Sequence, residues 1–328
     1  MNNPSYFSNG EKPIALVTGL TGQDGSYMCE LLLEKGYGVH GTMRRSATPN
    51  TSNVNKIISS IHTHLMDLSD ATSVNKVISE VKPDLMFCLA AQSDVRASYD
   101  IPLYTEDVTG VGFGRILEAV RMFCPECKVY QAGSSEMFGK VEAIPQSETT
   151  PFHPRSPYGC SKVFAFSLGR AYREGYGMKI YNGILFNHES PRRGHLFVTR
   201  KIVKAAVAIK NGTQKKLKLG NLESKRDWGY SKEYMEIIYD MVTTQEPQDF
   251  VVATGETHTI REFVDEVFIY LGLGDWEKYV EFDSNLTRPA EVDLLLGDAS
   301  KVKKLLGRDI KVKFKELVKI MCDAELSN

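Results

Sequence analysis

The sequence predicts an α/β fold in which a doubly wound parallel sheet forms a larger lobe and a smaller α/β lobe follows it. Two observations predict this fold. From Lys12 onward, short apolar stretches alternate with longer amphipathic ones, the pattern of a parallel sheet with helices between its strands. Beyond Asn187 this alternation stops and prolines and arginines appear, as in Ser190-Pro-Arg-Arg-Gly194, which indicates a second structural unit.

The bulk composition is that of a globular protein large enough for two lobes. The chain has 328 residues, of which 42% are hydrophobic and 25% charged, and its formal net charge is −1. This near-neutral balance gives no electrostatic reason to bind nucleic acid. The apolar runs are strand-sized, so no membrane span is expected. Residues 1–12 are polar and lack the apolar core of a signal peptide, which predicts a flexible N-terminal tail and a cytoplasmic protein.

Apolar and amphipathic stretches define the elements of the larger lobe. Apolar stretches predict strands at Ile14–Thr18, Val39–Met43, Leu85–Leu89, Lys128–Ala132 and Ile180–Phe186. Amphipathic stretches predict helices at Ser26–Lys35, Ala71–Val81 and Thr109–Phe123, and a later helix that carries Tyr158 and Lys162. A strand after each helix is the arrangement that places all strands parallel.

The second lobe is predicted to be discontinuous. Helices are expected at Leu196–Asn211, Ile260–Leu271 and Ala299–Leu306, whereas Tyr230–Val242 and Phe250–Val252 return to the first lobe. We therefore assign residues 13–186 plus about 227–254 to a dinucleotide-binding lobe of Rossmann type. Residues 187–226 plus about 255–328 are expected to form a substrate-binding lobe over the carboxyl ends of the strands, where open α/β sheets bind ligands.

A glycine-rich turn after the first strand predicts a dinucleotide site. The turn comprises Gly19, Leu20, Thr21, Gly22, Gln23, Asp24 and Gly25. Its GxxGxxG spacing permits a tight turn and a close approach of the backbone to pyrophosphate, and the helix that follows offers unpaired N–H groups. Glycines also make ordinary turns, but this one lies at the first strand–helix junction of a βαβ series, which favours the nucleotide interpretation.

The end of the second strand indicates which dinucleotide is bound. An enzyme that binds NAD usually has an acidic residue there for the ribose 2′-hydroxyl, whereas this chain has Arg44 and Arg45. Two guanidinium groups suit a 2′-phosphate, so the sequence predicts NADP; the alternative is a solvated basic turn. Asp67 and Leu68 are expected to flank the adenine. The end of the central strand is expected to lie beneath the ribose and nicotinamide, or simply to pack closely, through Leu89, Ala90, Ala91, Gln92 and Ser93.

Tyr158 and Lys162 form a candidate acid/base pair. They lie one helical turn apart and therefore share a face, so Lys162 is expected to lower the pKa of the Tyr158 phenol from its reference of about 10. Tyr158 could then take a proton from a sugar hydroxyl while hydride leaves the carbon. Glu136 adds a second acid/base group, which suggests elimination in addition to hydride transfer.

The six cysteines do not suggest a disulfide framework or a metal site. They are scattered along the chain, as expected for reduced thiols. Cys124 and Cys127 form a CxxC motif, but no second pair or suitably spaced histidine pair accompanies it, so no metal is predicted. Cys160 is interpreted as a small helix residue.

A Ser/Thr, Tyr and Lys set on this scaffold resembles the extended short-chain dehydrogenase/reductase superfamily. Longer stretches resemble, more specifically, the family of NADP-dependent GDP-mannose 4,6-dehydratases, over nearly the whole chain after Lys12. The stretches that carry this resemblance are Gly19–Gly25, Ser134–Gly139, Ser156–Lys162, Leu185–Gly194, Leu219–Leu222, Lys225–Gly229 and Arg288–Val292.

The resemblance implies a role for each matching residue. Tyr158, held by Lys162, would remove the O4 proton of GDP-mannose while hydride leaves C4, and Glu136 would take the C5 proton as the C6 hydroxyl is lost. Ser134, where many family members have threonine, would bond the O4 side. Further cofactor contacts would come from Tyr104, His188, Arg193 and Lys162. The sugar nucleotide would be bound by Ser134, Ser135, Glu136, Tyr158, Asn187, Lys201, Arg226, Arg288 and Glu291.

Three alternatives remain open. A nucleotide-sugar 4-epimerase would use the same Tyr/Lys pair but needs no carboxylate at position 136, and a dTDP-glucose-type dehydratase would be expected to have Asp-Glu where this chain has Ser135-Glu136. A non-catalytic NADP-binding sensor could dispense with the Tyr/Lys pair. The resemblance also implies a homodimer or homotetramer and a deoxysugar route through GDP-fucose or GDP-rhamnose. A secondary reduction of the 4-keto product is not decided by any residue.

Overall fold

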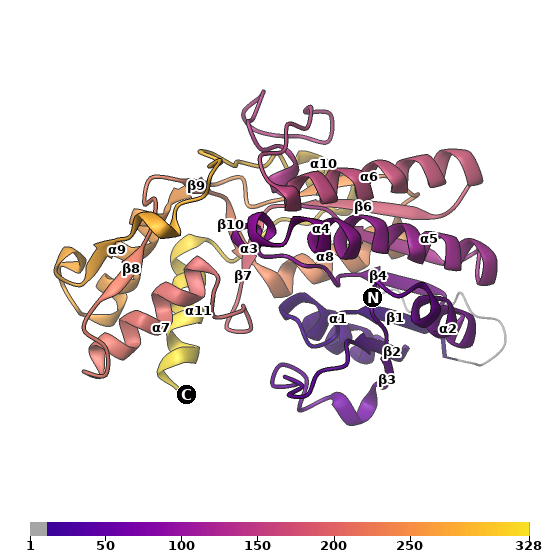
Figure 1. Cartoon of the computed structure of the whole chain (residues 1–328), viewed down its shortest axis with the longest axis horizontal. Helices are drawn as coiled ribbons and strands as arrows, with labels where there is room; N and C mark the ends of the chain where they lie inside the picture. The colour runs from indigo at the N-terminus through magenta and orange to yellow at the C-terminus, as the bar shows by residue number, and fades with distance from the viewer. Residues whose placement is uncertain (1–11, 328) are drawn as a thin grey trace.

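The computed structural model describes residues 12–327 and contains a seven-stranded parallel sheet (Figure 1). Its strand order is β11-β6-β5-β4-β1-β2-β3, so the chain winds outward from β1 in both directions. This order confirms the predicted doubly wound sheet. The strands are β1 (Ile14–Thr18), β2 (Gly38–Met43), β3 (His62–Leu65), β4 (Leu85–Cys88), β5 (Lys128–Ala132), β6 (Ile180–Leu185) and β11 (Asp249–Val252).

Helices cover both faces of this sheet. One face packs on α1 (Gln23–Glu34) and α8 (Ser231–Thr244) through a buried cluster that includes Tyr27 and Tyr234. The other face packs on α2 (Ala71–Val81), α5 (Gly112–Phe123) and α6 (Pro157–Tyr176). Because the inner strands are buried on both faces, they are nearly continuous apolar runs, as the sequence indicated, whereas the edge strand β3 is mostly exposed.

The second lobe lies at one end of the molecule, to the left of the sheet in Figure 1. Its own buried core joins α7 (Val198–Lys210), α9 (Ile260–Leu271) and α11 (Phe314–Leu326). Short strand pairs complete it or connect it to the sheet: β7 (Asn187–Glu189) with β10 (Trp228–Tyr230), β8 (Leu217–Leu219) with β13 (Val280–Phe282), and β9 (Lys225–Arg226) with β12 (His258–Thr259).

Several predicted boundaries differ by a few residues, for local reasons. Helix α1 begins at Gln23 rather than Ser26, because Gly22 is its extended N-cap and accepts the first helical bond from the Ser26 N–H. Strand β4 ends at Cys88 because the next two N–H groups, of Leu89 and Ala90, donate to the Thr18 hydroxyl at 3.0 Å instead of to a strand.

The helix expected at Thr109–Phe123 is part of a longer helical segment. It follows α3 (Val95–Asp100) and α4 (Pro102–Thr105), and a π-helical turn at Glu106–Val111 runs directly into α5. Such turns re-aim side chains within a helix. Here the Thr109 hydroxyl accepts a hydrogen bond from the Gln92 N–H and donates one to the Gln92 carbonyl, just beyond the end of the central strand.

Helix α10 (Ser300–Leu306) lies elsewhere than the sequence suggested. We expected it in the second lobe, but Val302 belongs to the buried cluster formed by the sheet, α1 and α8. The Lys301 ammonium group donates to the carbonyl of Asp249, the first residue of β11. Apart from Lys12, the predicted N-terminal tail lies outside the described residues.

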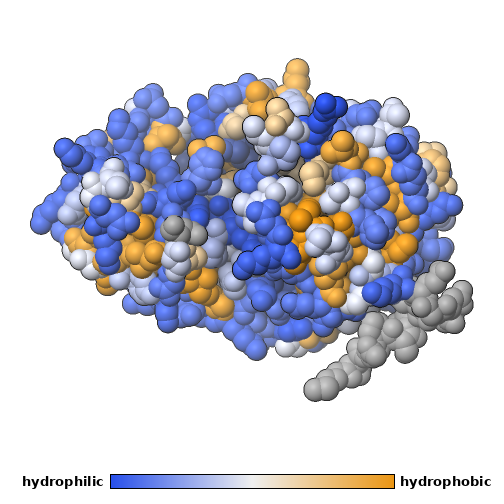
Figure 2. Space-filling view, turned by 90° about the horizontal axis from the view of Figure 1, so that it is seen from below, coloured by the Kyte–Doolittle hydropathy of each residue, from blue (hydrophilic) through white to orange (hydrophobic). Residues whose placement is uncertain are grey.

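The face in Figure 2 is mostly hydrophilic, with scattered hydrophobic residues. Within residues 12–327, no helix is long and apolar enough to cross a membrane.

Candidate active site

A cavity of about 670 Å³ lies at the carboxyl ends of the central strands and is also lined by residues of the second lobe. It brings together the glycine turn, the end of the central strand and the candidate acid/base residues. The predicted site residues that line it are Gly19, Thr21, Gly22, Gln23, Asp24, Gly25, Arg44, Leu68, Leu89, Ala90, Ala91, Gln92, Ser93, Tyr104, Ser134, Ser135, Glu136, Tyr158, Lys162, Asn187, His188 and Arg193.

The glycine turn has the geometry that a pyrophosphate cradle requires. Gly19 has φ +73°, in the left-handed region, and a Cβ there would lie 3.1 Å from the Cα of Ala90. A Cβ on Gly25 would lie 2.2 Å from the carbonyl oxygen of Gly19, so a larger residue would push α1 away from the turn. The N-terminus of α1 therefore lies at the cavity, with unpaired N–H groups that suit an anion.

The two arginines that follow β2 differ in whether they line the cavity. Arg44 lines the cavity and donates a hydrogen bond to the Tyr104 hydroxyl, which joins two predicted cofactor residues. Arg45 is exposed and does not line the cavity. Adjacent residues on an extended chain point in opposite directions, so one arginine can face the cavity while its neighbour does not.

Two other predicted cofactor residues also lie outside the cavity lining. Leu20 is completely buried in the core beneath the turn, as expected for an apolar side chain between two glycines. Asp67 accepts hydrogen bonds from the backbone and hydroxyl of Ser69, at 3.0 and 2.8 Å, and thereby stabilises a local turn.

Asp24 is tied to the second half of the chain. Its carboxylate accepts hydrogen bonds from His188 Nε2 at 2.9 Å and from the Ser231 hydroxyl at 2.7 Å. His188 also donates from Nδ1 to the Phe186 carbonyl at 2.8 Å. Burial opposes both charges, but the mutual attraction lowers the pKa of Asp24 and raises that of His188. Asp24 and His188 therefore form an ion pair that connects α1 to β7.

Gln23 adds to the same connection. Its amide donates to the His188 carbonyl at 3.0 Å and accepts from the Ser190 hydroxyl at 2.8 Å. The cofactor turn is thereby joined to the chain that leads into the second lobe.

Tyr158 and Lys162 both line the cavity, but the expected effect of the lysine on the phenol is wrong for this structure. Burial raises the pKa of Tyr158 to about 12, and a hydrogen bond with Ser134 is the largest effect that lowers it. The Lys162 ammonium group lies 5.7 Å from the centre of the Tyr158 ring and donates to the Ala132 carbonyl at 2.6 Å. Burial lowers the pKa of Lys162 to about 8. Lys162 is therefore directed to the end of β5, and Ser134 is the phenol's polar partner.

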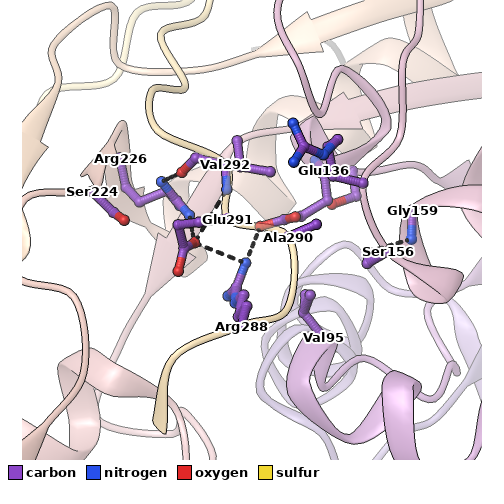
Figure 3. A network of polar contacts seen from close by, with 12 residues as sticks. Val95, Glu136, Ser156, Gly159, Ser224, Arg226, Arg288, Ala290, Glu291 and Val292 are labelled. Atoms are coloured by element: carbon purple, nitrogen blue, oxygen red, sulfur yellow. Dashed lines mark hydrogen bonds and ion pairs between the residues drawn. The ribbon is translucent and has the colours of Figure 1, made fainter. Parts of the chain in front are cut away.

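Glu136 belongs to a chain of charges that spans the two lobes (Figure 3). It lies in the 3₁₀ turn Ser135–Met137 after β5, and its carboxylate pairs with Arg288 at 3.0 Å. Arg288 also lies 3.8 Å from Glu291, which pairs with Arg226 at 3.3 Å. Burial opposes the charge of Arg288, but Glu136 and Glu291 outweigh it and raise its pKa.

The predicted sugar-nucleotide residues are thus only partly on the cavity wall. Asn187 lines it, and its buried amide oxygen has no hydrogen-bond partner among the described residues, which suits a ligand donor. Arg226, Arg288 and Glu291 form the charge network beside it. Lys201 is half-buried on α7 but outside the lining, and burial lowers its pKa.

Several cavity residues were not predicted from the sequence. Arg200 and Lys204 on α7 line the cavity where Lys201 does not, because residues four apart share a helix face and the next residue turns away. The basic character of this helix was the available signal. The loop after Arg44, the end of β6 and the segment between β7 and α7 also contribute lining residues that sequence reasoning missed: Asn50, Ser52, Asn53, Leu185, Phe186, Pro191, Arg192, Gly194, His195 and Phe197.

Comparison with known proteins identifies the family. The family model described as GDP-mannose 4,6 dehydratase matches residues 16–321. The chain is 53% identical to "GDP-mannose 4,6 dehydratase 1" of Arabidopsis thaliana, with 96% of this chain and 90% of the relative covered. It is 46% identical to the human "GDP-mannose 4,6 dehydratase", with 95% and 91% covered.

Among solved structures, the fold is similar to UDP-glucose 4-epimerase of Thermus thermophilus in complex with NAD. The TM-score is 0.84 and the identity 27%, and the match covers 95% of this chain and 98% of the other. The shared fold is thus common to several sugar-nucleotide enzymes, whereas the sequence similarity is specific. The chain belongs to the GDP-mannose 4,6-dehydratase family.

Proposed function

We propose that this protein is a hydro-lyase that converts GDP-D-mannose to GDP-4-keto-6-deoxy-D-mannose with loss of water, using NADP. The observation that carries the proposal is the presence of Glu136 and Tyr158 on one cavity that also contains the dinucleotide turn. Oxidation at one carbon and proton removal at the next require two acid/base groups within reach of one sugar ring. The family membership supports the same reaction.

The cavity fits a nicotinamide dinucleotide. The left-handed Gly19, the close packing at Gly25 and the free N-terminus of α1 suit the pyrophosphate. Arg44, at the end of β2, suits a ribose 2′-phosphate, which supports NADP over NAD. When bound, the cofactor supplies the acceptor for hydride from C4 and the donor that returns it to C6.

Tyr158 takes the O4 proton, which allows hydride to leave C4 and creates a 4-ketone. The Ser134 hydroxyl, bonded to the phenol, partly offsets the effect of burial on the Tyr158 pKa and can relay the proton. Lys162, bonded to the Ala132 carbonyl, fixes the end of β5 and thereby the position of Ser134.

Glu136 carries out the elimination. The new ketone acidifies the C5 proton, which the Glu136 carboxylate removes and then passes to the C6 hydroxyl, so that this group leaves as water. Arg288, at 3.0 Å, orients the carboxylate while Glu291 shares the guanidinium charge. General acid/base assistance of this kind contributes about 10²–10⁴-fold to a rate.

The GDP half of the substrate is assigned to the second lobe. Asn187, with its unpaired amide oxygen, can accept a hydrogen bond from the substrate, and Arg200 and Lys204 offer positive charge to the diphosphate. Arg226 and Lys201 extend this basic wall. We further propose a cytoplasmic homodimer or homotetramer in a deoxysugar route, as the family resemblance implies.

The first test is product analysis. The purified protein is incubated with GDP-mannose and the product is followed by mass spectrometry. Loss of one water is the expected result, whereas an unchanged mass with a new stereoisomer would indicate an epimerase and overturn the proposal. A parallel reaction with added NADPH reports whether the 4-keto product is also reduced.

The second test compares two adjacent arginines. Arg44→Ala is expected to weaken NADP binding by about 10–100-fold relative to NAD, because a charge-assisted hydrogen bond contributes about 1.5–3 kcal/mol. Arg45→Ala is the matched control and should change the NADP/NAD preference little, because Arg45 does not line the cavity. Equal effects of the two variants, measured by titration of both cofactors, would contradict the assignment of Arg44.

A further inference from the structure

The CxxC motif lies far from the active site, in the turn between α5 and β5. Cys124 is the C-cap of α5, and Cys127 directly precedes the first residue of β5. The cavity is at the carboxyl end of β5, where Gly133 lines it, so the motif lies at the opposite, amino edge of the sheet. The proposed dehydratase reaction makes no use of this motif.

The backbone already holds the two cysteines at disulfide distance. The Cys127 N–H donates to the Cys124 carbonyl at 2.9 Å, which closes a four-residue turn. Pro125 suits the second position of such a turn, whose end Cα atoms lie within about 7 Å. A disulfide needs Cα atoms about 4.4–6.8 Å apart, so the bond can form with little movement of the backbone.

The two thiols are neighbours and differ in environment. The Cys127 thiol donates to the Lys128 carbonyl at 3.6 Å. Its interaction with Cys124 lowers the pKa of the Cys124 thiol; burial opposes this effect and Lys82 adds to it. Cys124 is partly exposed, whereas Cys127 is 2% exposed and burial raises its pKa. A partly exposed thiol with a lowered pKa beside a buried thiol is the arrangement found in dithiol redox motifs.

The other cysteines lack this combination. Cys160 is exposed, but burial of its sulfur and the charge of Glu106 raise its pKa. Cys29, Cys88 and Cys322 are buried thiols whose pKa burial raises. No group of three or more metal-capable side chains gathers within residues 12–327, so a metal centre does not account for the pair.

We propose that Cys124 and Cys127 form a redox-active dithiol that a small disulfide, such as oxidised glutathione, converts reversibly into an intramolecular disulfide. The Cys124 thiolate attacks one sulfur of the oxidant, so that a mixed disulfide forms and one glutathione thiolate leaves. Cys127 then loses its proton to solvent and attacks the Cys124 sulfur, which releases the second glutathione. Two protein thiols are oxidised and one glutathione disulfide is reduced to two thiols.

The test uses the full-length native protein. After incubation of the folded protein with oxidised glutathione, the chain is unfolded in urea so that buried thiols react, free thiols are blocked with maleimide, and intact mass and peptide mapping are recorded. Two of the six cysteines should become unreactive, with a loss of two hydrogens and no retained glutathione on the peptide that contains Cys124 and Cys127. Reduction with dithiothreitol should restore all six. Retained glutathione on Cys124, or reaction of Cys160 alone, would overturn the proposal.

Two variants separate the contributions of Cys127. Cys127→Ser keeps a polar neighbour for Cys124 but cannot close the disulfide, so Cys124 should stop at the mixed disulfide. Cys127→Ala also removes this polar neighbour, so the mixed disulfide should form several-fold more slowly. Turnover of GDP-mannose is measured alongside and should change little in both variants, because the motif is remote from the cavity. Equal rates of mixed-disulfide formation in the two variants would contradict the proposal that Cys127 activates the Cys124 thiol.

Discussion

Asp24 and Glu136 are two carboxylates on the wall of one cavity, yet their surroundings differ. The Asp24 carboxylate accepts hydrogen bonds from His188 and Ser231, and Gln23 donates a third one at 3.1 Å. Glu136 has one side-chain partner among the described residues, Arg288, which it shares with Glu291. A carboxylate whose two oxygens both accept hydrogen bonds from the protein stabilises the fold. A carboxylate with a partner at only one oxygen can still accept a proton from a ligand.

A position beside a cofactor-binding turn therefore does not by itself give a carboxylate a role in the reaction. The sequence placed both carboxylates at the site, but Asp24 connects α1 to β7 and so positions the turn. Glu136 follows β5 in a short 3₁₀ turn that begins after Ser134, and is thus presented from the end of a strand. Each carboxylate can be tested by its neutral, isosteric amide.

Glu136→Gln is expected to have the largest effect. Loss of the proton acceptor should lower turnover of GDP-mannose by about 10²–10⁴-fold. Cofactor binding should persist, because the turn and Arg44 are untouched. Steady-state rates and a cofactor titration measure the two effects. If this variant kept full turnover, Glu136 would have no role in the elimination.

Asp24→Asn should instead act mainly on stability. The free energy of unfolding should fall by about 2 kcal/mol, because His188 loses its charge partner. Urea unfolding of this variant and of Glu136→Gln provides reciprocal controls. The distinction between the two carboxylates fails if Glu136→Gln is the more strongly destabilised of the pair.

The Asp24–His188 pair also predicts a pH dependence of stability. The lowered pKa of Asp24 stabilises the fold above the ordinary carboxyl pKa of about 4, and this contribution is lost as pH falls through the folded value. The raised pKa of His188 stabilises below its ordinary value of about 6.5, and this contribution is lost as pH rises through the folded value. The stability difference between the native chain and Asp24→Asn should therefore be largest near pH 5–6 and smaller near pH 9. A difference that does not vary with pH, in urea unfolding at several pH values, would argue against the ion pair.

Ser134→Thr should have the smallest effect. Threonine retains the hydroxyl that bonds Tyr158 and adds one methyl group, so turnover should change by only a few-fold, in either direction. Ser134→Ala is the matched control, because it removes the hydroxyl, and should lower turnover by clearly more. Equal rates for the two variants would show that the hydroxyl does not assist Tyr158.

Most elements could be predicted because their patterns are local. Ala71–Val81 and Ile260–Leu271 agree residue for residue with α2 and α9, since each has an amphipathic repeat and clear ends: Asp70 caps α2, and Gly272 ends α9 in the left-handed region. Helix α10 was placed in the wrong lobe because its seven residues are helical in either setting. Only its packing on the sheet, seen at Val302, decides where it lies.

The order of strands and helices along the chain, the glycine turn and the residue types that acid/base chemistry needs could all be predicted from local sequence patterns. These depend on short-range periodicity and on conformations that only certain residues adopt. The tertiary structure alone decided that Arg44 and not Arg45 reaches the cavity, that Ser134 and not Lys162 bonds the Tyr158 phenol, and that Arg288 holds Glu136. Those choices depend on contacts between residues up to 152 positions apart, and the directions of the side chains are set by packing that no local pattern encodes.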